Sequence, residues 1–166
     1  DCKLSITFWV FTQEPIKFET ITTKTQSQFE ENNEISIIIE ILSQNEFTNN
    51  KIIKITTMDE ADDSIIHNVT YLMTITKNGN ELFTNYFFAK DELFIQVNPD
   101  TDDDIKISGE RRYELDALIA DSDVPIIISG SFFDFDSTYE FDISLRTIHD
   151  SENYIFLNEF YAKIMT

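Results

Sequence analysis

Apolar and polar residues alternate with a period of two along most of this chain. The clearest example is segment 3–12, where Leu4, Ile6, Phe8 and Val10 fall on one face. Because successive side chains of a strand point to opposite faces, this period predicts β-structure. Similar runs predict strands at 16–25, 35–42, 51–57, 65–76, 81–88, 93–97, 124–133, 138–148, 154–157 and 160–164. The pattern therefore predicts about ten short strands.

Three segments add detail to this pattern. Asn78-Gly79 lies between two alternating runs and indicates a tight hairpin. Segment 35–42 is β-branched and nearly continuous, which predicts a central strand covered on both faces. In segment 111–120 the apolar residues are three or four positions apart, so one or two helical turns are expected there.

Together these elements predict an all-β fold, a single antiparallel β-sandwich of the immunoglobulin-like or jelly-roll-like kind. The length of 166 residues suits one domain over 1–166. Segment 1–12 is an apolar strand with no capping element beside it in the sequence. We expect it to lie at a sheet edge or to be exchanged with a neighbouring subunit.

Charge excludes several classes of function. The chain has 12 Lys and Arg against 31 Asp and Glu, a net charge of −19 with a pI near 4.2. Such a chain repels phosphate backbones and anionic lipid, so nucleic acid is not an expected partner. No apolar run reaches the roughly 18 residues needed to span a bilayer, so no transmembrane segment is expected.

Groups that commonly carry out catalysis are few. The histidines are His67 and His149, and the single cysteine is Cys2. Only 3 glycines are present, which argues against glycine-rich phosphate loops, and no Gly-x-Ser-x-Gly occurs. A Ser-His-Asp triad is recognised by geometry rather than by order, but nothing in the sequence points to one. We therefore expect no catalytic residues and no enzymatic activity.

Carboxylates are the one rich set of potential ligands. Calcium takes six to eight oxygen ligands, and Asp-rich loops at one end of a sandwich can supply them. The alternative is that acidic loops in so negative a chain only keep it soluble. The candidate calcium ligands are Asp100, Asp102, Asp104, Asp121, Asp123, Asp134 and Asp136. Calcium is the only cofactor that the sequence suggests.

The region around 65–155 carries a resemblance to a known group of proteins. Asn68 begins the glycosylation sequon Asn-Val-Thr, in keeping with an exported chain. Segments 67–71 (HNVTY), 76–83 (TKNGNELF), 139–143 (YEFDI) and 147–150 (TIHD) resemble exported β-sandwich proteins of ammonia-oxidising archaea. The resemblance implies an extracellular or cell-envelope location, and it carries over no catalytic residues.

Two hypotheses of function follow from the sequence. The first is a non-catalytic structural or interaction protein of the cell exterior, a homo-oligomer or a partner of another cell-surface protein. It would self-assemble as a surface or filament subunit through terminal-strand pairing. The second is a calcium-dependent binding module for a carbohydrate, lipid or protein.

Overall fold

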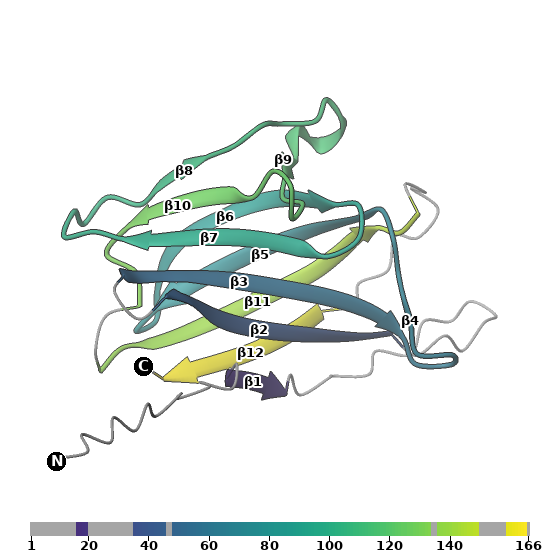
Figure 1. Cartoon of the computed structure of the whole chain (residues 1–166), viewed down its shortest axis with the longest axis horizontal. Coiled ribbons are helices and arrows are strands. Elements are labelled where there is room, and N and C mark those ends of the chain that lie inside the picture. The colour runs from purple at the N-terminus through teal and green to yellow at the C-terminus, as the bar shows by residue number, and fades with distance from the viewer. Residues whose placement is uncertain (1–15, 20–34, 46–47, 134–135, 150–158, 166) are drawn as a thin grey trace, which may run out of the picture.

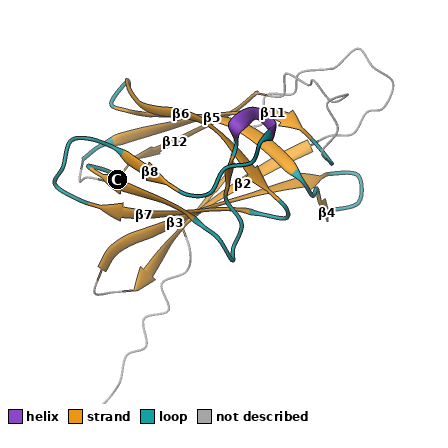
Figure 2. Cartoon of the chain, turned by 90° about the horizontal axis from the view of Figure 1, so that it is seen from above, coloured by secondary structure: helices purple, strands orange, loops and turns teal. Residues whose placement is uncertain are grey.

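The computed structural model shows two β-sheets packed face to face (Figures 1 and 2). It describes residues 16–19, 35–45, 48–133, 136–149 and 159–165. The predicted β-sandwich is confirmed, with twelve strands in the described part of the chain, two of them only two residues long. Segment 1–12, including Leu4, Ile6, Phe8 and Val10, lies outside the described residues, as does Cys2.

The larger sheet has seven strands in the order β1-β2-β3-β7-β10-β8, with β4 paired to the end of β3. Every neighbouring pair in it is antiparallel except β7 and β10, which run parallel from Ile95 beside Ile126 to Pro99 beside Gly130. Its strands are β1 (Ile16–Glu19), β2 (Ile35–Asn45), β3 (Thr48–Asp59), β4 (Ser64–Ile65), β7 (Leu93–Pro99), β8 (Lys106–Ser108) and β10 (Ile126–Gly130).

The smaller sheet has five strands in the order β12-β11-β5-β6-β9. Its strands are β12 (Glu159–Met165), β11 (Thr138–Thr147), β5 (Val69–Lys77), β6 (Asn80–Ala89) and β9 (Leu118–Ile119). The predicted hairpin is confirmed between β5 and β6, where Asn78 and Gly79 have φ of 51° and 82°. Two successive positive φ values are what a two-residue turn of type I′ requires.

The core lies between the two sheets and is built from the inward half of each alternating strand. Ile53 on β3 and Ile95 on β7 face Met73 on β5 and Phe141 on β11, and all four side chains are fully buried. Burial of a side chain of this size stabilises a fold by about 1.5–3 kcal/mol relative to leaving it exposed. The apolar residues that recur at every second position of the sequence are therefore those whose side chains form the core.

Three local predictions were wrong in detail. Segment 65–76 is not one strand, because Asn68 adopts φ of 53° and separates β4 from β5. The helical turns expected over 111–120 reduce to the 3-10 turn η1 (Glu114–Asp116), and β9 follows it. The segment 35–42 is covered on one face only, since Ile38 points away from the core and is 37% exposed. Continuous β-branched sequence thus does not by itself show that both faces of a strand are covered.

One buried hydrogen bond joins the two sheets through the core. The Tyr71 hydroxyl on β5 and the Thr57 hydroxyl on β3 lie 2.7 Å apart, and both side chains are fully buried. Burial raises the pKa of the Tyr71 phenol well above its usual range, so the group stays neutral. Each hydroxyl therefore satisfies the other in a place that water does not reach.

Tyr71→Phe is expected to destabilise the fold by about 1–3 kcal/mol, because it leaves the Thr57 hydroxyl buried without a partner. Adding Thr57→Val removes that unsatisfied group, so the double variant should be more stable than Tyr71→Phe alone. Urea unfolding of the two single variants and the double variant measures the coupling. Strictly additive losses would show that the two hydroxyls do not depend on each other.

Candidate functional site

The acidic loop at 100–104 connects β7 to β8 at one end of the sandwich. Its backbone is tied to the end of β10, since Asp100 N–H donates to the Gly130 carbonyl and Ser131 N–H donates to the Asp102 carbonyl, both at 2.8 Å. Asp100, Asp102 and Asp104 are all exposed. The loop is therefore held in place by its main chain, and its carboxylates face solvent.

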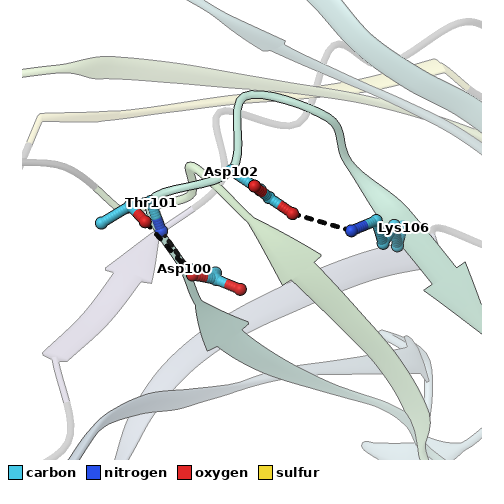
Figure 3. A network of polar contacts seen from close by, with 4 residues as sticks. All are labelled: Asp100, Thr101, Asp102 and Lys106. Carbon is cyan, nitrogen blue, oxygen red and sulfur yellow. Dashed lines mark hydrogen bonds and ion pairs between the residues drawn. The ribbon is translucent and has the colours of Figure 1, made fainter.

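Two of these carboxylates already have partners (Figure 3). Asp100 Oδ1 accepts a hydrogen bond from the backbone N–H of Thr101 at 2.7 Å, and Asp102 Oδ2 pairs with Lys106 Nζ at 2.8 Å. The Lys106 ammonium lowers the pKa of the Asp102 carboxyl. A lysine side chain thus neutralises part of the negative charge that was expected to attract a cation.

The remaining candidate calcium ligands divide between the two ends of the molecule. Asp121 and Asp123 precede β10, whereas Asp100 follows β7, and these strands are parallel. The two loops are separated by the length of five paired residues, roughly 16 Å. Asp121 instead accepts a hydrogen bond from the backbone N–H of Lys90 at 2.6 Å.

Two further candidates follow β10 along the chain. Asp136 is exposed and lies just before β11, whereas Asp134 is outside the described residues. Among the residues that the structure describes, no group of three or more His, Cys, Asp or Glu side chains could hold a metal ion. The structure therefore does not bring the six described candidate aspartates into one site, and calcium binding stays a prediction.

Both histidines lie at the end of the sandwich where Asp121 is found. His67 Nδ1 is 2.7 Å from Asp91 Oδ1, with more than half of each side chain exposed, and His149 N–H donates to the His67 carbonyl. Asn68 follows His67 in the chain, directly before β5, and its side chain is half-buried. Its backbone N–H donates a hydrogen bond to the Lys90 carbonyl. The sequon asparagine thus lies in a connection at the rim of the sandwich, and its glycosylation stays a prediction.

The two lateral sides of the sandwich are built differently. On one side β1 of the larger sheet contacts β12 of the smaller sheet. On the other side the sheets end in β8 and in β9, and β9 pairs with β6 at Phe87 and Phe88 alone. Figure 1 shows the first side at the bottom and the second at the top. The smaller sheet therefore ends in a long strand, β6, with a very short neighbour.

The outer edge of β6 is consequently open over the seven residues from Asn80 to Tyr86, where no other described strand pairs with it. An open strand edge presents unpaired N–H and C=O groups that can bind another strand. We call this stretch the β6 edge. The sequence did not reveal it, because alternation predicts a strand without indicating its neighbours in the sheet.

The fold and these surfaces define a two-sheet β-sandwich protein. The chain matches no protein family, no curated protein and no solved structure. Within the described residues, no helix has both the length and the apolar character required to cross a membrane.

Proposed function

We propose that this chain is a non-catalytic structural subunit of the cell exterior, which assembles with copies of itself through terminal-strand pairing. The observation that carries the proposal is the β6 edge, a strand edge open over seven residues. Proteins normally shorten, charge or cover such an edge to prevent association. The extracellular or envelope location rests on the sequence resemblance to exported β-sandwich proteins.

Charge supports the amino-terminal segment as the part that associates. At a net charge of −19, copies of this chain repel each other over most of their surface. Residues 1–13 hold only Asp1 and Lys3 as charged side chains, so this segment is neutral. The alternating apolar residues Leu4, Ile6, Phe8 and Val10 give it one hydrophobic face. A neutral, half-apolar strand can approach a second copy without the repulsion that separates the rest of the surface.

The proposal predicts that deleting residues 1–12 abolishes assembly and leaves a folded β-sandwich. Light scattering of the purified protein, in millimolar calcium and again in chelator, measures the assembled mass. Circular dichroism reports whether the β-structure persists. The matched control is Ser5→Ala with Thr7→Ala, which changes the two hydroxyl residues on the face shared with Trp9 and Phe11 and keeps the face of Leu4, Ile6, Phe8 and Val10.

Large particles are expected for the full chain and the control in both solutions, with monomers for the deletion. A full chain that stays monomeric in both solutions contradicts self-assembly. Undiminished assembly of the deletion variant contradicts terminal-strand pairing. Assembly that requires calcium would instead favour the calcium-dependent binding module.

A further inference from the structure

We propose that the β6 edge is the acceptor for residues 3–12 of a second copy of this chain, which pair with it as an added strand. This inference rests on the proposed function and names the surface through which it would operate. It places an apolar, neutral segment beside β6, a long strand whose outer edge no other described strand pairs with from Asn80 to Tyr86.

The backbone of the β6 edge faces outward at defined residues. Ala120 N–H donates to the Phe88 carbonyl at 2.9 Å, so the polar groups of Phe88 point away from β5 and toward β9. In an antiparallel pair, alternate residues direct both backbone groups to the same side. The β5–β6 register is unbroken from Phe83 to Ala89, so Tyr86 and Thr84 also direct their N–H and C=O groups to the open side.

The side chains of this edge show which way each face of an added donor strand would point. Phe83 is 7% exposed and faces the core, whereas Thr84 is exposed on the outer face, where its hydroxyl lies 2.8 Å from that of Thr74. A donor strand in register would place its apolar residues on the core side. Its opposite face, which carries Ser5, Thr7, Trp9 and Phe11, would then lie on the outer side beside Thr84. Backbone hydrogen bonds, together with the apolar core-side residues, would hold the added strand.

The lengths of donor and acceptor also agree. The stretch from Leu4 to Val10 contains seven residues, as does the β6 edge from Asn80 to Tyr86, in which the β5–β6 register shifts at Leu82. Across the open side, Ile107 on β8 and Leu82 on β6 are half-buried and pack against the core. A strand added here would cover apolar surface that one copy leaves partly exposed.

A second copy, rather than the same chain, is the expected donor. Residues 11–15 join the paired stretch 4–10 to β1, and this link spans at most about 20 Å when extended. A strand added beyond β6 would lie four strand spacings from β12, roughly 19 Å. Because β1 lies in the other sheet, about 10 Å from the smaller one, a straight path from β1 to the β6 edge is longer than roughly 19 Å and crosses the packed core. The link is therefore too short to pass around the core and reach the β6 edge of its own chain.

This arrangement makes the assembly head-to-tail. The donor leaves the molecule on the side of β1 and β12, and the acceptor lies on the opposite side. An interface between two different surfaces is heterologous, and such contacts generate open filaments unless their rotation closes a ring. Each added copy would present a new β6 edge to the next donor.

Thr84→Pro tests the acceptor directly. Proline removes the outward N–H of Thr84 and places its ring at the open edge, while the ladder to β5 does not use that N–H. We expect the apparent affinity of assembly to fall by about tenfold or more. Thr84→Ala is the matched control, because it removes the same hydroxyl and keeps the N–H, so the difference between the two variants measures the loss of the N–H and the added ring.

Mixing two full-length variants separates this inference from the proposed function. Thr84→Pro keeps the donor, whereas Ile6→Asp with Phe8→Asp keeps the acceptor. Each should be monomeric alone, and an equimolar mixture should form dimers and nothing larger in light scattering. A mixture that stays monomeric, or a Thr84→Pro chain that assembles like the parent, overturns the assignment to β6. A parent chain that never assembles overturns the proposed function itself.

A photocrosslink provides a result even if Thr84→Pro does not fold. p-Benzoylphenylalanine in place of Phe8 keeps an aromatic side chain in the donor of an otherwise unchanged chain. After irradiation, mass spectrometry of the intermolecular products should place the crosslink within the β6 edge or on the facing residues of β8. Crosslinks confined to other strands would overturn the proposal.

Discussion

Phe132→Ala is expected to lower the free energy of unfolding by about 3–5 kcal/mol, which is the largest stability effect of a single substitution proposed for this chain. Phe132 lies outside any strand, directly after β10, yet its side chain is fully buried. Its ring lies 5.1 Å from that of Tyr139 and 6.5 Å from that of Phe83, stacked on both. Alanine would leave a cavity in the core beside the Phe83 and Tyr139 rings, which these rigid rings cannot easily fill.

The matched control is Phe133→Ala. The Phe133 ring contacts the same cluster edge-on, 4.7 Å from Phe132, but the side chain is only half-buried. Its loss should cost about 1–2 kcal/mol, because less apolar surface returns to water. Thermal unfolding compares the two, and about 3 kcal/mol corresponds to a drop of roughly 6–12 °C for a chain of this length. Equal losses would show that the cluster does not depend on the buried ring.

Gly130→Ala is expected to have the second largest effect, about 2–4 kcal/mol, from strain and crowding together. Gly130 has φ of +133°, a conformation that side-chain-bearing residues rarely adopt. A Cβ there would lie 2.8 Å from the Asp104 carbonyl oxygen and 3.0 Å from the Ile105 side chain. The carbonyl belongs to the backbone of the acidic loop, so this loop would have to move.

Gly79→Ala provides the control for the backbone contribution. Gly79 also has a positive φ, +82°, but a Cβ at this position would meet nothing within 4 Å. The substitution should cost about 1–2 kcal/mol, from backbone strain alone. Differential scanning calorimetry of both variants separates strain from crowding. If Gly130→Ala is no worse than Gly79→Ala, the acidic loop yields freely and its position is not fixed by the end of β10.

The sequence by itself determined the class of the fold and its most local feature. The two-residue period in strands such as β11 and β5 predicted a β-sandwich, because the buried face of a strand must pack against another sheet. Asn78-Gly79 predicted the β5–β6 hairpin, since few residues other than Asn and Gly adopt two successive positive φ values. Both features depend on neighbouring residues, and the order of the residues is enough to predict them.

Only the tertiary structure decided which strands are neighbours, and the candidate site depends on that choice. The parallel pairing of β7 with β10 puts Asp100 and Asp121 at opposite ends of the sheet, although the two loops are equally acidic in sequence. The pairing of the two-residue β9 with β6 leaves Thr84 and Tyr86 on an open edge. Strand order is set by packing between residues far apart in the chain, and alternation carries no information about it.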